Sequence, residues 1–364
     1  MTSTSPRVFV KPLRGGWTIT EVLVALTVIG IMASLAIPAV LGIRESARRV
    51  QCQSNLRGIA LSVQSFSDVQ CRYPAMAYHH RSIDVGYYRN WVVEILPWIG
   101  ETEISQGWDI SRFNWEPSND RLAAHPIPEI VCPSDDSDIA GGPDLSYVVN
   151  GGYGWSGIHT ATRVPRVGAG KLIDYNGNGI VGAGESAGTS LPSDKSLYFN
   201  TSLFFLGIWP HGSDVEVAKH SPASVHDGLS NTLMISENVR AGFDSKRINA
   251  MGWASTFPSR IAFFVSMYVC NDLVCREGQV DYARANGSQF PATTEALNSS
   301  IDQPEGTPWP SSLHGDGVNF AFCDGRVKFI SESIDGAVYA ALASPQGLRI
   351  RGPLYQIVPG DSDY

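Results

Sequence analysis

Residues 1–70 carry two successive patterns of polar and apolar positions. Residues 1–16 are polar, with three cations and no acid. Residues 17–43 are apolar apart from the charge of Glu21, and about 27 such residues suffice to cross a bilayer core of about 30 Å. From residue 43 to residue 66, apolar residues recur mostly every three or four positions, which is typical of one helix face. The pattern predicts one helix of about fifty residues, half in lipid and half, residues 44–70, packed on a domain.

Two other interpretations of the apolar segment are weaker. A secretory signal peptide has a shorter apolar core and a cleavage site formed by small residues, whereas this run is too long. A plain membrane anchor does not explain Glu21, because a carboxylate in a membrane is costly without a partner and therefore indicates a function. Orientation is not settled by charge, because three cations precede the segment and four follow it closely.

The last part of the chain carries a hairpin pattern. Residues 318–322 alternate between apolar and polar or small positions, Asp324-Gly325 follows, and residues 327–330 continue the strand pattern. Asp-Gly between two such runs is a strong hairpin signal, because glycine accepts a positive φ. Similar reasoning predicts a turn at Asp227-Gly228, a strand at 232–236 and a short closing helix at 334–343.

These elements predict an α+β fold. We expect the long N-terminal helix to lie over an antiparallel β-sheet with loop-rich β insertions. The 36 glycines and 22 prolines agree with a body rich in turns.

Composition narrows the class of protein. With 43% apolar and 17% charged residues, the chain is a folded protein, and its formal charge of −8 sets nucleic-acid binding aside. An even number of cysteines beyond the apolar segment suggests disulfides in an exported domain, with fifteen possible pairings, whereas buried free thiols are the alternative. The cysteines are Cys52, Cys71, Cys132, Cys270, Cys275 and Cys323, of which only Cys270 and Cys275 lie close together in the sequence.

Residues 14–21, Arg-Gly-Gly-Trp-Thr-Ile-Thr-Glu, resemble the leader and processing site of type IV prepilins and type II secretion pseudopilins. The resemblance implies that prepilin peptidase cuts after Gly16 and methylates the new N-terminus at Trp17, where these families usually have phenylalanine. It further implies that Glu21, the fifth mature residue, pairs with the N-terminal amine of a neighbouring subunit, so that each buried charge neutralises the other. Pro38 matches the helix proline of these families.

The same resemblance implies partners and a location. The partners would be prepilin peptidase, other pilin-like subunits bound through the N-terminal helix, and the membrane. The protein would cross the cell inner membrane once, with its C-terminal domain extracytoplasmic.

The body resembles the large family that carries domain of unknown function 1559. The resemblance lies in four stretches: residues 42–64, Cys132-Pro-Ser-Asp135, residues 226–237, and His314 followed by nine residues and Asp324-Gly325, the prepilin-processing-associated His-x9-Asp-Gly pattern. Residues 150–220 match little and are interpreted as a variable insertion. The expected division is a leader at 1–16, a transmembrane and assembly helix at 17–43, an amphipathic continuation at 44–70, an extracytoplasmic domain at 71–346 with the His-x9-Asp-Gly hairpin at 314–330, and a tail at 347–364.

Candidate chemistry in the body is sparse. His314 is a possible ligand or catalytic base, but a hydrogen bond that fixes the entrance of the hairpin is the favoured role. Aromatic residues concentrated between 87 and 115 could stack on sugars, although such residues more often form a core. We find no phosphate-binding loop, nucleophile elbow or paired carboxylates, and therefore predict no enzyme.

The variable insertion contains one metal-binding pattern. Residues 174–185 fit the twelve-residue calcium loop D-x-[DN]-x-[DN]-G-x5-E, with a glycine at the sharp turn. Two Asn-Gly turns in a hydrated insertion are the alternative, and the flanks do not look helical. The predicted Ca²⁺ ligands are the side chains of Asp174, Asn176, Asn178 and Glu185 and the backbone carbonyl of Ile180.

Two function classes follow, with an extracytoplasmic enzyme as a remote third. The first is a membrane-anchored, pseudopilin-like structural subunit of a type II secretion or type IV pilus-like system, which predicts assembly through the apolar helix. The second is a helix-tethered binding domain for carbohydrate or another solute, which predicts a concave aromatic pocket in a monomeric body.

Overall fold

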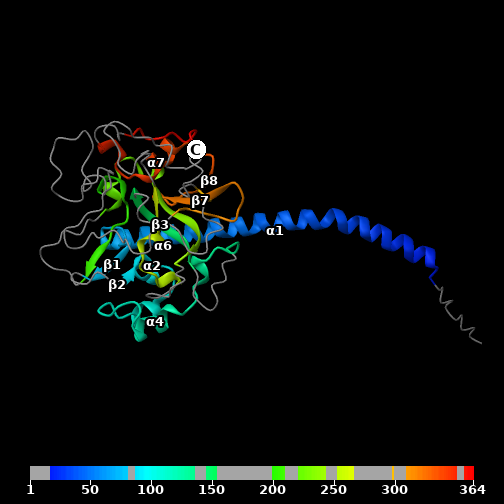
Figure 1. Cartoon of the computed structure of the whole chain (residues 1–364), viewed down its shortest axis with the longest axis horizontal. Coiled ribbons are helices and arrows are strands. Elements are labelled where there is room, and N and C mark those ends of the chain that lie inside the picture. Colours follow the sequence, from blue (N-terminus) through cyan, green and yellow to red (C-terminus); the bar gives the residue numbers. More distant parts are fainter. Residues whose placement is uncertain are drawn as a thin grey trace, which may run out of the picture. The chain divides into compact units, whose positions relative to one another are not determined.

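The computed structural model describes residues 17–80, 87–135, 145–153, 199–209, 220–242, 252–265, 297–298, 309–350 and 356–364. The chain divides into two compact units, Met1–Ala47 and Arg48–Tyr364, and the second is called the body here. Figure 1 labels the helices and strands.

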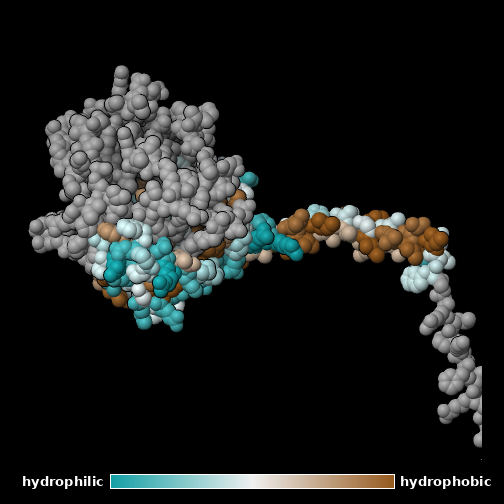
Figure 2. Space-filling model, turned by 60° about the horizontal axis from the view of Figure 1, so that its bottom comes forward, coloured by the Kyte–Doolittle hydropathy of each residue, from teal (hydrophilic) through white to brown (hydrophobic). Residues whose placement is uncertain are grey.

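Helix α1 (Ile19–Gln70) confirms the prediction of one long helix, with 52 residues. It begins at a capping box, in which the Thr18 hydroxyl accepts from the Glu21 backbone N–H at 3.2 Å and the Glu21 carboxylate accepts from the Thr18 N–H at 2.8 Å. The Thr18 hydroxyl also donates to the same carboxylate oxygen at 2.9 Å. Side chains at 17–43 are all exposed, and Figure 2 shows the apolar ones on the surface of the first unit. The helix is long and apolar enough to cross a membrane.

The part of α1 in the body is amphipathic, as predicted for residues 44–70. Its buried apolar residues recur at intervals of three or four and join the main core, while the intervening positions are mostly exposed. They are Cys52, Leu56, Ile59, Ala60, Val63 and Phe66.

The main sheet has five strands in the order β6-β3-β5-β7-β8. Neighbouring strands are antiparallel except for β3 and β6, which are parallel. The α+β class is therefore confirmed, but the sheet is mixed rather than purely antiparallel. The long connection between β3 and β6 allows this, because a parallel pair needs a crossover of about a dozen residues or more. The strands are β3 (Leu145–Tyr153), β5 (Leu233–Ala241), β6 (Ala262–Val265), β7 (Gly317–Phe322) and β8 (Val327–Ser331).

Both faces of this sheet are covered. Successive side chains of a strand point to opposite faces, so two neighbouring residues of β7 show which helix covers each face. Asn319 in β7 accepts a hydrogen bond from Gln53 of α1 at 2.9 Å, whereas the ring of the next residue, Phe320, lies 6.0 Å from Tyr339. Tyr339 belongs to α7 (Gly336–Ala343), the closing helix predicted at 334–343, and the side chain of Asp335 caps it. The sheet therefore lies between α1 and α7.

The predicted hairpin is confirmed. Strands β7 and β8 pair in register, and the chain reverses over residues 323–326. Gly325 has a φ of 83° and donates its N–H to the Phe322 carbonyl at 2.9 Å. The turn predicted at Asp227-Gly228 precedes β5, which extends to Ala241, beyond the predicted strand.

The described part of the body also contains a smaller sheet and several short helices. The sheet has the order β2-β1-β4, with β1 (Ala77–His80), β2 (Tyr87–Asn90) and β4 (Gly207–Trp209). The helices are α2 (Trp91–Ile95), α3 (Thr102–Gly107), α4 (Pro117–Ala123), α6 (Pro258–Ile261) and the 3-10 turns η1 (Leu96–Trp98), η2 (Pro128–Ile130), η4 (Pro222–Ser224), η5 (Leu229–Asn231), η6 (Gly252–Ala254) and η8 (Gly347–Arg349).

The aromatic segment between 87 and 115 mostly forms core. Trp91 and Trp108 are buried in the main cluster, and Tyr88 is buried in a smaller one. Trp115 is 45% exposed and stacks on Phe113 with ring centroids 5.4 Å apart. Most of the described aromatic side chains of this segment therefore stabilise the body.

Candidate functional site

Four side chains that can bind metals or react chemically meet where α1 packs on the main sheet. Cys52 of α1 and Cys132, which follows η2, form a disulfide with their Cα atoms 5.0 Å apart. Glu237 of β5 and His314, just before β7, lie beside it, and one ligand atom from each of the four lies within 4.8 Å of the others. All four residues are buried. We call these residues the buried cluster.

Side-chain hydrogen bonds to backbone carbonyls at Cys52 and next to Cys132 fix the two cysteines. The side-chain amide of Asn55, one turn after Cys52 on α1, donates to the Val131 carbonyl at 3.0 Å. The hydroxyl of Tyr147 in β3 donates to the Cys52 carbonyl at 3.2 Å. Helix, sheet and the segment around Cys132 are therefore held together beside the disulfide.

Glu237 is held by Asn319 of the neighbouring strand β7. The Asn319 backbone N–H donates to Oε2 at 3.1 Å, and its side-chain amide lies 3.0 Å from both carboxylate oxygens. Burial raises the pKa of the Glu237 carboxyl, while His314 and the Asn319 donors oppose that rise by favouring the charged form. The carboxylate is thus fixed in orientation and directed at the cluster.

His314 completes the cluster. Its Nε2 lies 3.3 Å from Cys132 Sγ and 3.6 Å from Glu237 Oε1, and its side chain is fully buried. The sequence placed His314 in a hydrogen bond at the entrance of the hairpin. In the structure its ring contacts Cys132 and Glu237, which belong to two other segments of the chain.

A second junction joins the hairpin turn to the segment that contains Asp227-Gly228. Asp324 donates its N–H to the Leu229 carbonyl at 3.1 Å, and Cys323 donates to the Thr232 carbonyl at 3.0 Å. Gln64 of α1 donates to the Cys323 carbonyl at 2.8 Å. Cys323 and Asp324 therefore hold the hairpin against α1 and the start of β5.

The two junctions bring together all four stretches that resemble one family. Cys52 and Gln64 lie in the first stretch, Cys132 in the second, Glu237 in the third and His314 in the fourth. No local pattern indicated that Glu237, the last residue of its stretch, would face His314. The contact arises only when β5 and β7 pair.

The other predicted site residues have different outcomes. Trp17 is exposed and Glu21 forms the capping box of α1. Gly16 and the calcium-loop residues Asp174, Asn176, Asn178, Ile180 and Glu185 lie outside the described residues, as do Cys270 and Cys275. Among the described cysteines, Cys71 and Cys323 are not in disulfides.

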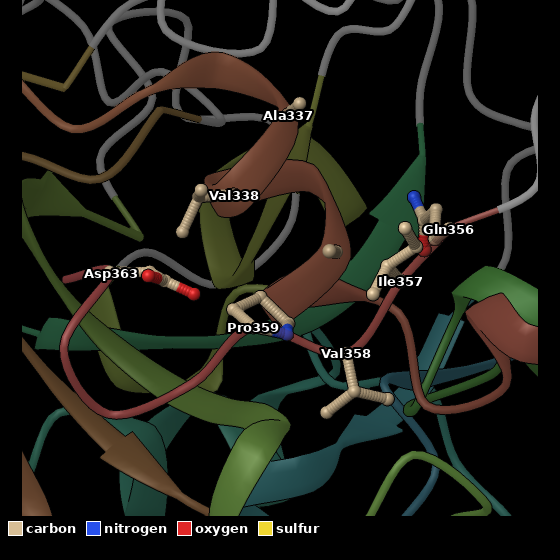
Figure 3. Close-up of a pocket in the computed structure, with 8 residues that line it drawn as sticks. Ala337, Val338, Gln356, Ile357, Val358, Pro359 and Asp363 are labelled. Atoms are coloured by element: carbon tan, nitrogen blue, oxygen red, sulfur yellow. The ribbon is translucent and has the colours of Figure 1, made fainter.

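A groove lies between α7 and the C-terminal residues 356–363 (Figure 3), with a volume of about 320 Å³. Its lining is mainly apolar, and no aromatic side chain contributes to it. It therefore lacks the stacking surface that the carbohydrate-binding alternative predicts. The lining residues are Ala337, Val338, Ala341, Gln356, Ile357, Val358, Pro359 and Asp363.

The apolar helix and the α+β body together fit a membrane-anchored protein with an extracytoplasmic body. The family model described as "Protein of unknown function (DUF1559)" matches residues 42–337. The chain belongs to this family. Comparisons with curated proteins and with solved structures found no match.

Proposed function

We propose that the protein is a pseudopilin-like structural subunit of a type II secretion or type IV pilus-like system. The observation that carries this proposal is the environment of residues 17–43, where every side chain is exposed although most are apolar. The body has a buried hydrophobic core of its own. Lipid before assembly, and the helices of other subunits after it, would remove this surface from water.

Glu21 supports the proposal through its position at the start of α1. Its hydrogen bonds from Thr18 both end on Oε2, and no described residue donates to Oε1, which could therefore accept from another chain. Cleavage after Gly16 would create an ammonium group at Trp17, four residues before this carboxylate. In an assembly of parallel helices, the ammonium group of one subunit and the Glu21 of its neighbour would neutralise each other in an apolar environment.

Processing is tested on the native protein. N-terminal mass spectrometry should find a chain that begins at Trp17 and carries a methyl group on its terminal nitrogen. A native chain that begins at Met1, or after a site beyond residue 35, would contradict processing by prepilin peptidase.

Assembly is tested with two variants that separate charge from capping. Glu21→Gln keeps the capping box, because glutamine also accepts from the N-cap residue, but it removes the charge. Thr18→Ala removes the capping hydroxyl, keeps the charge and weakens the helix start by about 1 kcal/mol. We expect Glu21→Gln to lower the cross-linked, assembled fraction about tenfold or more, as for the loss of a charged hydrogen bond, while processing continues.

Thr18→Ala should assemble nearly as well as the unchanged chain. Equal assembly of Glu21→Gln and the unchanged chain would refute the pairing of charges between subunits. Dispersed monomers of the unchanged, processed chain would refute the structural-subunit proposal itself and favour a tethered binding domain.

A further inference from the structure

We propose that the dithiol form of the body binds one zinc ion at the buried cluster, through Cys52, Cys132, Glu237 and His314, and that the disulfide is the oxidised form of the same site. This inference goes beyond the proposed function and does not depend on it. A disulfide is uncharged and needs no acid or imidazole beside it. Glu237 and His314 nevertheless converge on its sulfurs in a buried region.

The donor set matches zinc. Two cysteine thiolates, one imidazole nitrogen and one carboxylate oxygen are the ligands that Zn²⁺ takes in tetrahedral protein sites. Calcium and magnesium take oxygen ligands, so two sulfurs among four ligands exclude them. The structure supplies all four ligands from side chains and leaves the site closed to solvent, which is typical of structural zinc sites.

The distances also match. Zinc–ligand bonds of about 2.0–2.3 Å at tetrahedral angles place neighbouring ligand atoms about 3.3–3.8 Å apart. His314 Nε2 lies 3.3 Å from Cys132 Sγ and 3.6 Å from Glu237 Oε1, so two edges of the tetrahedron are nearly formed. To bind the ion, the two sulfurs leave bonding distance and move about 3.8 Å apart. The other ligand atoms, which already lie within 4.8 Å of one another, adjust to tetrahedral spacing.

An outer shell already orients the carboxylate ligand. Asn319 donates to both oxygens of Glu237 and itself accepts from Gln53 of α1 at 2.9 Å. Hydrogen bonds of this kind fix metal ligands and raise metal affinity. Zinc would join the same four segments that the disulfide and the Glu237–His314 contact join, so the body would keep its fold in either state.

The two states differ by two electrons. A dithiol reductant breaks the Cys52–Cys132 bond, becomes a disulfide, and passes its two protons to the two cysteine sulfurs. Zinc then binds both sulfurs as thiolates and releases these two protons to solvent. Before export, in a reducing compartment, the chain would carry zinc. After export, thiol–disulfide exchange with a disulfide oxidant, which takes two electrons from the thiolates and two protons from solvent to become a dithiol, would form the Cys52–Cys132 bond and release the ion.

The experiment uses the full chain in detergent. One sample is purified under a water-soluble phosphine, which is oxidised to phosphine oxide and keeps the cysteines reduced, and a second is purified oxidised. Both are equilibrated with micromolar zinc, freed of excess metal and measured by metal mass spectrometry. The reduced chain should hold one zinc per chain and the oxidised chain none. Cobalt in place of zinc should give the thiolate-to-cobalt absorption of a tetrahedral site with two sulfurs.

Matched variants locate the ion. A chain with Cys71→Ser, Cys270→Ser and Cys275→Ser should keep the one zinc, whereas Cys52→Ser with Cys132→Ser should lose it. Asn319→Ala, which leaves all four ligands in place, should weaken zinc binding about 10–100-fold.

Three outcomes would overturn the proposal: no zinc in the reduced chain, equal zinc after loss of Cys52 and Cys132, or a cobalt spectrum without two-thiolate absorption. The cobalt spectrum is recorded on the unchanged sequence and therefore decides the question even where a variant fails to fold.

Discussion

The two halves of α1 differ in the solvent exposure of their apolar side chains. Leu26 and Ile37 in the first unit are about 60% exposed, at 59% and 60%, whereas Leu56 in the body is 0% exposed. Burial of one such side chain contributes about 1.5–3 kcal/mol, so the first half leaves a large stabilisation unused in the isolated chain. The body encloses a hydrophobic core, whereas the apolar side chains of the first unit are exposed in the isolated chain.

Removal of residues 1–47 tests this contrast most directly. A chain that begins at Arg48 should lose membrane association entirely, because all of the exposed apolar run is gone, while the disulfide and both sheets remain. Membrane fractionation measures the first effect, and calorimetry should give the same melting temperature as for the body within the full chain in detergent. A shortened chain that still sediments with membranes, or melts well below the full chain, would break the contrast.

The disulfide should carry the next largest effect, and only within the body. Cys52 and Cys132 are 80 residues apart, so their bond closes a long loop and should contribute about 4 kcal/mol to the free energy of unfolding. Replacing both by alanine should lower the urea midpoint of the oxidised body accordingly. The matched control is Cys71→Ala, which removes an exposed thiol outside any described disulfide and should change little. A loss of less than about 1 kcal/mol in the double variant would refute this role.

Local patterns predicted the elements of both units well. The long apolar run and its amphipathic continuation predicted α1, and the Asp324-Gly325 turn between alternating residues predicted the pairing of β7 and β8. Each of these signals lies within a few neighbouring residues, where helix periodicity and turn chemistry dominate. The capping box at Thr18 and Glu21 is equally local, but it was not predicted, because Glu21 was interpreted only through its charge.

The buried cluster was not predictable in the same way. The pairing of Cys52 with Cys132 is one of many connectivities that the sequence allows, and spacing gave no reason to prefer it. Glu237 and His314 meet because β5 and β7 are neighbours, and the order of strands in a sheet depends on tertiary packing. For the same reason the sequence did not reveal the parallel pairing of β6 with β3.

A glycine substitution in the hairpin should change the free energy of unfolding of the body by a smaller amount. Gly325 has a φ of 83°, and an added Cβ would lie 3.3 Å from the Gln64 side chain. Gly325→Ala should therefore destabilise the body by about 1–2 kcal/mol, chiefly through backbone strain. Gly58→Ala on α1, where nothing lies within 4 Å of the added Cβ, should instead stabilise it by about 0.5–1 kcal/mol. Urea unfolding of both variants gives the comparison, and equal signs would refute the turn argument.

The last prediction concerns calcium, which would make the stability of the body depend on a bound ion. We propose from the sequence that Asp174, Asn176, Asn178, the Ile180 carbonyl and Glu185 bind Ca²⁺. With only two carboxylates among these ligands, the dissociation constant should be about 0.1–1 mM, as in extracellular modules.

Binding to the folded state alone would then stabilise the body by about 0.6–1.8 kcal/mol at roughly 2 mM calcium. Melting curves of the body with calcium, with chelator and with magnesium as the matched ion measure this shift. Asp174→Ala should abolish the response to calcium and leave the curve in chelator unchanged, because it removes a ligand that acts only when the ion is bound. If calcium and chelator give the same curve for the unchanged body, the two Asn-Gly sequences are turns and the body needs no ion from outside.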